Sequence, residues 1–204
     1  MDKIISIGCS HAHWATYGLD QYIMIHLGPR TAYNIQNHDD QVQEELNKHP
    51  KDLPVVFFLG EVDCRVHVFK QALETKRSAN DVIFEIVNRY TNYIYVLWKS
   101  RPNYVYIMNV EPAADIDDPK YSINHGYTWE ELNRITLEFN RQLKEACEAR
   151  GITFLDIYDQ MLEPGGNGRR RESWVRICTS FGRDPAHLDS HVGTAIYEKY
   201  FAKK

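Results

Sequence analysis

The sequence contains few cysteines and no long apolar run. Its four cysteines, Cys9, Cys64, Cys147 and Cys178, include no pair spaced as CxxC. This scatter indicates reduced thiols rather than a disulfide framework or a zinc–cysteine site. No window approaches the ~18 consecutive apolar residues of a membrane-spanning helix, and the apolar stretch after Asp2 is too short for a secretory signal peptide. We therefore expect a cytoplasmic protein with no membrane partner.

Basic residues are not concentrated in any long run. The formal net charge is −4, and the longest basic run is the triplet Arg169, Arg170 and Arg171. A surface that binds nucleic-acid phosphates usually shows a clustered excess of Lys and Arg, so we expect no nucleic-acid partner. The chain has 204 residues, of which 43% are hydrophobic and 25% charged. This composition is typical of one α/β domain over 1–204, whose core needs no metal or disulfide.

Five apolar runs of strand length recur along the chain. They are rich in Ile, Val, Phe and Tyr and are continuously apolar rather than alternating, which is typical of strands covered on both faces of a parallel sheet. Helical patterns lie between them, and one opens with the capping-box spacing of Thr128 and Glu131. The apolar runs are 3–8, 22–27, 54–60, 103–110 and 152–158, and the helical patterns are 39–49, 78–100, 128–151 and 190–201.

Strands and helices thus alternate along the chain without a linker or a repeat. Right-handed crossovers place helices on both faces of such a sheet. We therefore predict an α/β fold, a three-layer α/β/α sandwich with a five-stranded parallel sheet and flavodoxin-like topology. Two long loops, 111–126 and 163–173, stay unassigned, and loops of that length in compact domains are usually functional or mobile. Ligands in such folds bind beyond the carboxyl ends of the strands.

The carboxyl end of the first predicted strand carries nucleophilic and basic side chains. There IISIGCSHAHW (4–14) passes Gly8 and presents Ser10 at a strand-to-helix turn. A serine at such a turn directs its hydroxyl and its own N–H to one pocket, which supplies a nucleophile and an oxyanion donor. Asp184 and His187 stand three positions apart before the last helix. In a tight turn, this spacing lets the carboxylate orient the imidazole as a base.

Each of these residues also has a purely structural interpretation. Ser10 after a strand is commonly a helix N-cap, Asp184 followed by Pro185 is typical of a turn, and His187 is equally an ordinary surface histidine. Their joint placement at one edge of the predicted sheet favours the catalytic interpretation. His191, on the last helix, is the second choice of base.

These motifs, in this order, resemble those of the SGNH or GDSL hydrolases. The resemblance is carried by the Gly-x-Ser start, by GEVDCR (60–65) after the third strand, and by DPAHLDSHVGTAIYEKY (184–200). It spans residues 3–201 and implies the fold of that family and a serine esterase without metal or organic cofactor. GEVDCR also resembles a subgroup found among carbohydrate-surface genes. The substrate implied is an O-acyl ester, O-acetyl above all, on a carbohydrate or small molecule.

The resemblance implies roles for the matching positions. Ser10 would be the nucleophile that carries the acyl group, His187 the general base and then acid, and Asp184 the residue that orients His187. Gly28, after the second strand, would donate its N–H to the oxyanion. The other residues expected in oxyanion or substrate binding are His11, Arg30, Asp63 and Arg65.

Two positions depart from the family pattern. Cys9 stands where the first block usually has Asp, and Val62 stands where the third block has an Asn that completes the oxyanion hole. Losing one such donor lowers turnover by ~10²–10³, so we expect Arg65, or a backbone N–H between Asp63 and Arg65, to replace it. Asp63 is more typical of scaffold, as a helix cap or an ion-pair partner of Arg65. Arg65 and Arg30 are also suited to clamp an anionic group.

Two other classes of function stay open. His11 and His13 faintly resemble the opening of metallophosphoesterases, but that family places Asp at the position of Cys9. Histidines i, i+2 apart on a helix do not face each other, so no metal site is expected. Val62 favours the other class, a carbohydrate-binding module that kept the fold and lost the chemistry. Loop aromatics suited to stack on a sugar ring are Tyr33, Tyr121, Tyr127 and Trp174.

Overall fold

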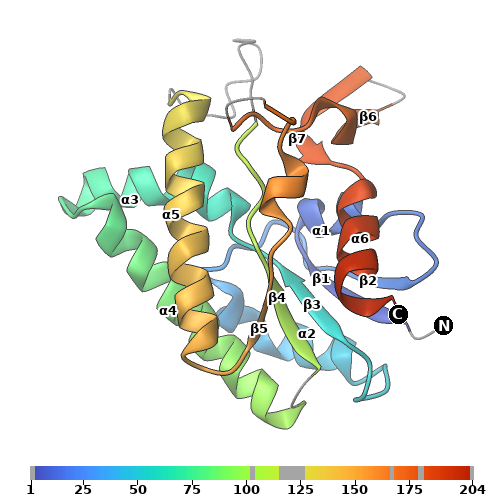
Figure 1. Ribbon diagram of the computed structural model, residues 1–204. Helices are drawn as coiled ribbons and strands as arrows, with labels where there is room; N and C mark the ends of the chain where they lie inside the picture. Colours follow the sequence, from blue (N-terminus) through green and yellow to red (C-terminus); the bar gives the residue numbers. More distant parts are fainter. Residues whose placement is uncertain (1–2, 102–103, 115–126, 166–167, 179–181, 203–204) are drawn as a thin grey trace.

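A five-stranded parallel sheet forms the centre of the computed structural model, which describes residues 3–101, 104–114, 127–165, 168–178 and 182–202, without the side chains of 175–178 and 182–186 (Figure 1). The strand order is β2-β1-β3-β4-β5, with every neighbouring pair parallel. This is the doubly wound, flavodoxin-like order, so the predicted sheet is confirmed. The strands are β1 (Ile4–Gly8), β2 (Tyr22–His26), β3 (Val55–Phe58), β4 (Val105–Met108) and β5 (Thr153–Leu155).

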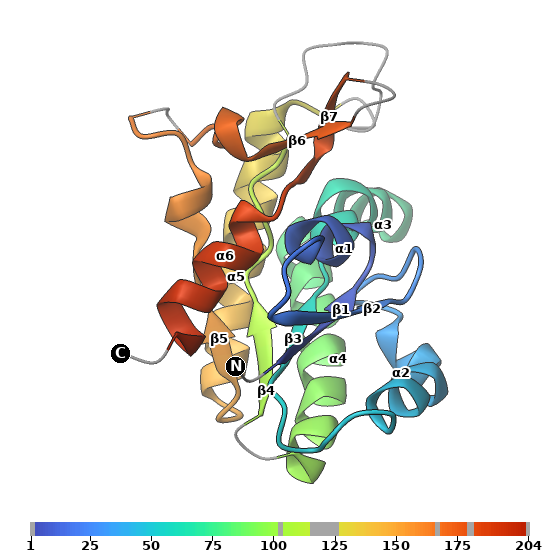
Figure 2. The ribbon, with the colours of Figure 1, turned by 90° about the vertical axis from the view of Figure 1, so that its right-hand side faces the viewer.

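Helices cover both faces of the sheet. Figures 1 and 2 show α4 and α5 on one face and α1 and α6 on the other. The α-helices are α1 (Ser10–Thr16), α2 (Asp39–Leu46), α3 (Val68–Thr75), α4 (Ala79–Ser100), α5 (Trp129–Glu148) and α6 (His191–Ile196). Short 3₁₀ segments are Ile35–His38, Tyr158–Met161 and Glu172–Trp174, and π-helical segments are Asp63–His67 and Tyr197–Phe201.

The continuous apolar runs are explained by two hydrophobic cores. In β3, Val55 and Phe57 join the core that includes α4 and α5, whereas Val56 and Phe58 join the core that includes α1 and α6. Successive side chains of a strand point to opposite faces of the sheet. Because both faces are covered, every position of β3 is apolar and buried.

Local capping fixes where the two longest helices begin. The Ser78 hydroxyl accepts a hydrogen bond from the Asp81 N–H at the start of α4. At the start of α5, Thr128 and Glu131 form the complete capping box that their spacing predicts. Such contacts satisfy backbone N–H groups that have no acceptor inside the helix.

A helix near Arg65, which the cap interpretation of Asp63 implied, is present as the π-helical segment Asp63–His67 and α3, which continues it. An antiparallel hairpin of β6 (Val175–Cys178) and β7 (Gly182–Leu188) was not expected from the sequence pattern. Figure 2 shows β7 above α1, leading down into α6.

The hairpin corrects the expectation of a tight turn from Asp184 to His187. Asp184 pairs with Arg176 and Leu188 pairs with Val175, so three residues of β7 lie between positions that face consecutive residues of β6. This is a bulge, and Pro185 within it has no N–H to donate to the strand ladder. His187 therefore belongs to a bulged strand instead of a turn.

Of the helices in the described ranges, none combines the length and the apolar character needed to cross a bilayer.

Candidate active site

The hydroxyl of Ser10 contacts an imidazole instead of capping a helix. Ser10 is the first residue of α1, and Cys9 holds the N-cap position without a side-chain cap. The Oγ atom of Ser10 lies 2.9 Å from Nε2 of His187, and both residues are half-buried. This is the spacing of a hydrogen bond between a nucleophile and a general base.

Gly8 allows the close packing that places Ser10. A Cβ atom at Gly8 would lie 2.4 Å from the Phe58 carbonyl oxygen and 2.8 Å from the Ala12 Cβ. Neither gap admits a side chain, so β1 can turn into α1 at this distance from β3 only with glycine. The strand thus ends on Gly8 because the turn that carries Ser10 is pressed against the neighbouring strand.

The two expected partners of the base have different outcomes. The backbone of Asp184 lies on β7, but its side chain lies outside the described residues, so its contact with His187 stays a prediction. His191 is exposed, and its Nδ1 lies 2.6 Å from Oδ1 of Asp189. Its ring stacks on Trp174 at a centroid distance of 5.8 Å. The bulge of β7, and not α6, supplies the imidazole at Ser10.

Gly28 lies at the same sheet edge as Ser10. The Leu27 N–H donates to the Gly8 carbonyl at 2.9 Å, which continues the register of β2 with β1. Gly28 has φ +75°, in the left-handed region that favours glycine. Among the described residues, no atom lies within 4 Å of where its Cβ would be. The backbone beside the Cys9–Ser10 turn is therefore open on this side.

Asp63 has the scaffold role instead of a place in substrate binding. Its side chain is fully buried. One carboxylate oxygen accepts the Ala32 N–H at 2.7 Å, and the other accepts the Tyr33 N–H at 3.3 Å. Burial raises the pKa of Asp63 to about 7, although these two hydrogen bonds act in the opposite direction. Asp63 thus tethers the loop that begins at Gly28.

The arginines expected to form an anion clamp lie in separate settings. Arg65 Nε lies 2.6 Å from Glu61 Oε1, and Arg65 Nη2 lies 3.2 Å from Oε2. The side chain of Arg30 follows Gly28 and is half-buried, and within the described part of the chain its Nε atom is buried with no hydrogen-bond partner. Arg65 is therefore committed to a carboxylate one helical turn away, and neither expected contact with Asp63 nor a free guanidinium at Ser10 is observed.

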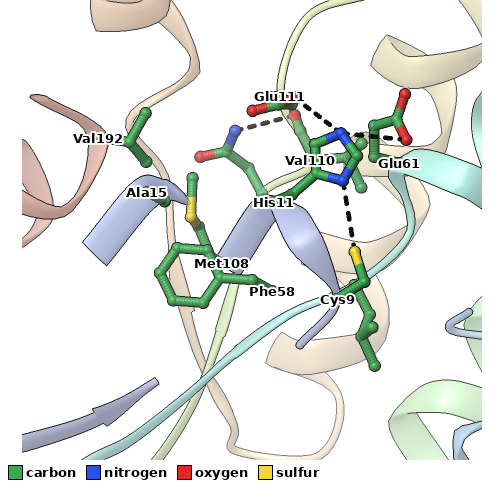
Figure 3. A pocket seen from close by; sticks show the side chains of 11 residues that line it. Cys9, His11, Ala15, Phe58, Glu61, Met108, Val110, Glu111 and Val192 are labelled. Atoms are coloured by element: carbon green, nitrogen blue, oxygen red, sulfur yellow. Dashed lines mark hydrogen bonds and ion pairs between the residues drawn. The ribbon is translucent and has the colours of Figure 1, made fainter. Parts of the chain in front are cut away.

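His11 lies at the centre of a buried charged cluster (Figure 3). Its Nε2 lies 3.3 Å from Glu61 Oε2 and 3.4 Å from Glu111 Oε1, and its Nδ1 lies 3.3 Å from the Cys9 Sγ. Glu111 in turn pairs with Arg170, at 3.2 Å. The His11 side chain is only 9% exposed. Both ring nitrogens of His11 are engaged, so it is no free substrate-binding group.

The charges of this cluster decide the protonation of His11. Burial lowers the pKa of the His11 imidazole to about 4, and Glu61 only partly opposes the shift. The ring is therefore neutral near pH 7. Burial alone would raise the pKa of Glu61, but His11 and Arg65 outweigh it and the pKa is lowered. Burial also raises the pKa of the Cys9 thiol to about 11.

These states leave one consistent arrangement of hydrogens. The His11 nitrogen that faces two carboxylates carries the proton, because carboxylates only accept hydrogen bonds. The other nitrogen then accepts from the Cys9 S–H. Cys9, which stands where the resembled family has Asp, thus fixes the orientation of the His11 ring.

Three members of the cluster were missed in the sequence. Glu61 stands inside the GEVDCR motif, but the resemblance drew attention to its neighbours Val62 and Asp63. Glu111 follows β4 at the sheet edge where ligands bind, which was the available signal. Arg170 lies in a basic triplet and gave no local signal, because its partner Glu111 is 59 positions away.

A small pocket adjoins the cluster (Figure 3). Its volume is about 20 Å³, enough for one water molecule. It therefore offers no room for a sugar. It is lined by Cys9, His11, Ala15, Phe58, Leu59, Glu61, Met108, Asn109, Val110, Glu111 and Val192.

The loop aromatics expected to stack on sugar are engaged by protein groups. Tyr127 stacks on Phe69 at 4.0 Å, and the guanidinium of Arg89 lies 4.1 Å from the centroid of the Tyr33 ring. Trp174 is buried and stacks on His191, as described above. Tyr121 lies outside the described residues.

A further set of aromatic side chains lies along α1, beyond Ser10. His13 and Trp14 lie one turn beyond Ser10, and the exposed Tyr17 follows the helix. The rings of His13 and Trp14 are 4.4 Å apart, those of His13 and Tyr17 are 5.4 Å apart, and those of His13 and His26 are 5.8 Å apart. His13 thus packs among aromatic rings, whereas His11 faces the carboxylates. The two histidines do not converge on one point.

Known proteins resemble this chain in fold. No protein-family model and no curated protein matches the chain. A lipase/acylhydrolase from Enterococcus faecalis is 15% identical, with a TM-score of 0.55 over 96% of this chain and 93% of that one. A carbohydrate acetylesterase from Sinorhizobium meliloti is 15% identical, with a TM-score of 0.54 over 96% and 94%. An aryl esterase from M. smegmatis is 15% identical, with a TM-score of 0.54 over 97% of each chain.

These structures have the same layers and span nearly the whole of this chain. The identities are low, so the likeness concerns the fold. The sequence motifs predict that fold independently. The chain therefore has the α/β fold of the SGNH and GDSL-like hydrolases.

Proposed function

We propose that this protein is a serine esterase of the SGNH type, which hydrolyses O-acyl esters through an acyl-enzyme on Ser10. The observation that supports this most directly is the 2.9 Å approach of Ser10 Oγ to His187 Nε2. A serine needs such a base, because its hydroxyl is a weak nucleophile at neutral pH. The pair lies at the sheet edge where ligands of this fold bind.

The reaction proceeds in two halves. The Ser10 hydroxyl gives its proton to His187 Nε2 as Oγ bonds to the acyl carbon, and the carbonyl electron pair moves to its oxygen. The bond to the alcohol then breaks, and His187 returns the proton to the leaving oxygen. Water, deprotonated by the same imidazole, releases the acid and restores Ser10.

Two backbone groups are proposed to hold the oxyanion. The Ser10 N–H stands at the first position of α1, where helix N–H groups have no intrahelical acceptor. Gly28 lies at the same edge, on a loop that Asp63 tethers. Val62 supplies no side-chain donor, and Arg65 is occupied by Glu61. The hole is thus built from backbone amides, which are less mobile than a side chain.

The alcohol side of the substrate is proposed to be a carbohydrate. Trp14 and Tyr17 extend from Ser10 along α1, and Tyr17 is 63% exposed. Aromatic rings present flat apolar faces that suit sugar rings. Among the structures with this fold are the carbohydrate acetylesterase named above and an acetylxylan esterase from Geobacillus stearothermophilus. An O-acetyl ester on a sugar is therefore the substrate to test first.

The proposal is tested with p-nitrophenyl acetate and a serine-directed fluorophosphonate. Wild type should hydrolyse the ester and take up one label on Ser10, and Ser10→Ala should lose both properties by more than ~10³-fold. Ser100→Ala, at the far end of α4, is the matched control and should keep both. If Ser10→Ala keeps its activity, or if the wild type loses its activity in EDTA, the metallophosphoesterase alternative is favoured. No turnover and no labelling of wild type would favour a binding module.

A further inference from the structure

The cluster around His11 concentrates more buried charged groups than the stability of the fold requires. Two carboxylates contact one imidazole there and each pairs with a guanidinium. The side chains of Glu111 and Arg170 are 8% and 2% exposed. Buried ion pairs add little net stability, because removing charges from water costs about as much as their attraction returns. Such a cluster beside a nucleophile and a base is more typical of a functional site.

The His11 ring packs beside His187, the base of the candidate pair. The ring centroids of His11 and His187 are 4.6 Å apart, with an interplanar angle of 42°. The two ring nitrogens of His11 are held at the same time, one by the carboxylates and one by Cys9. The orientation of the His11 ring is therefore fixed, and the ring packs against His187.

We propose that His11, held by Glu61 and Glu111, is a positioning residue that stabilises the imidazolium which His187 becomes during ester hydrolysis. The inference rests on the proposed function, because only acyl transfer through Ser10 charges His187. The two carboxylates draw the Nε2 hydrogen of His11 towards themselves and leave more electron density on its ring. A cation beside such a ring is attracted to its face, as to an aromatic ring.

The carboxylates also act on His187 through space. Within the described part of the chain, the titratable and charged groups near His11 come from several elements. They are the Cys9 thiol before α1, Glu61 and Arg65 near α3, Glu111 after β4, Arg170 before Glu172–Trp174, and His187 on β7. The two guanidiniums balance the two carboxylates. Neutralising one carboxylate removes a negative charge near His187 and therefore disfavours its imidazolium.

This arrangement complements the loss of the third oxyanion donor. The transition state of acyl transfer carries a negative oxygen and a positive imidazole. Val62 cannot stabilise the negative oxygen as an Asn would. The His11 cluster instead stabilises the His187 imidazolium of the same transition state. Stabilisation of this cation partly compensates for the missing oxyanion donor.

The test is the pH profile of Glu61→Gln on p-nitrophenyl acetate. Glu61 is preferred because its partner Arg65 is 19% exposed and can turn to water. We expect kcat to fall about tenfold with KM unchanged, and the acidic limb of kcat/KM to move down by about one pH unit. Glu145→Gln, on the exposed face of α5, is the matched control and should leave the profile in place.

The outcomes separate this inference from the proposed function. A lower kcat with an unmoved acidic limb would show a purely structural role for Glu61 and overturn the inference, as would an unchanged kcat. If Glu61→Gln does not fold, as judged by circular dichroism, Glu111→Gln gives the same readout with the same criteria. An active Ser10→Ala enzyme would instead overturn the proposed function, whatever the profile of Glu61→Gln.

Discussion

His187 Nε2 lies 2.9 Å from Ser10 Oγ, although 177 positions separate the two residues. The contact depends on two local features at once. Gly8 lets the turn before Ser10 approach β3, and the bulge in β7 brings His187 to the start of α1. The hydrogen bond thus joins the first and the last elements of the fold.

His187, and not His191, should be the base. His187→Gln should lower kcat/KM for p-nitrophenyl acetate by about 10³-fold or more, because His187 Nε2 contacts Ser10 Oγ and is the proposed acceptor of its proton. His191→Gln is the matched control, since its ring is exposed and bonded to Asp189. Steady-state kinetics of the two variants decide the assignment. A larger loss in His191→Gln would reverse it.

Arg65→Ala should reduce stability. Arg65 balances Glu61, which is 12% exposed, so the variant leaves a buried carboxylate with less compensation. We expect the free energy of unfolding to fall by about 2 kcal/mol in urea denaturation. Lys70→Ala, which removes an exposed ion pair with Glu74, should leave it nearly unchanged. Equal stabilities for the two variants would contradict the buried-cluster interpretation.

The pH dependence of stability should reveal two opposing groups. The pKa of His11 is lowered from 6.5 to about 4, so its contribution of the order of 3 kcal/mol is lost as pH falls through this window. The pKa of Asp63 is raised from 3.8 to about 7, so its contribution is lost as pH rises through nearly the same window. The two effects partly cancel in the wild type.

Asp63→Asn separates these effects. Without the Asp63 carboxyl, the free energy of unfolding should rise more steeply between pH 4 and pH 7 than in the wild type, because only the His11 effect remains. Urea denaturation at four or five pH values measures the two slopes. Parallel curves for wild type and variant would mean that Asp63 titrates at its ordinary pKa in the folded protein.

Gly28 and Gly18 offer a matched pair for the oxyanion hole. Their φ angles are +75° and +74°, and an added Cβ at either position would have no atom of the described segments within 4 Å. Alanine at either position should cost about 1 kcal/mol of stability through backbone strain. Only Gly28→Ala should also lower kcat, by about tenfold, because the strained peptide carries the proposed donor N–H. Equal kcat values for the two variants would exclude Gly28 from the hole.

The sheet and the longest helices follow from local sequence. Strands covered on both faces are mostly apolar, as the fully buried β3 shows, so the five runs can be recognised from the sequence alone. The helices α4 and α5 begin at residues whose side chains cap their own backbone, a contact within four positions. The hairpin of β6 and β7 is different. Gly182 and Pro185 disfavour a strand locally, and pairing with β6 overrides that preference.

The pairing of Ser10 with His187 could be predicted from the sequence because of the topology of the fold. Parallel strands with right-handed crossovers bring their carboxyl ends to one edge, so Ser10 after β1 could be placed with the segment before α6. The conformation of that segment could not be foreseen, because a bulge depends on the register with β6 and not on the residues 184–187 alone.

The partners of the buried charges were decided by tertiary structure alone. The sequence left Arg65 available to hold an oxyanion, but Arg65, on the π-helical segment, pairs with Glu61, which lies just before that segment and contacts His11. Glu111 and Arg170 meet across 59 positions of chain without any periodic pattern between them. Apolar burial follows a period that one strand or helix already displays. An ion pair is chosen instead by which two side chains lose water at the same place, and only the packed fold determines that.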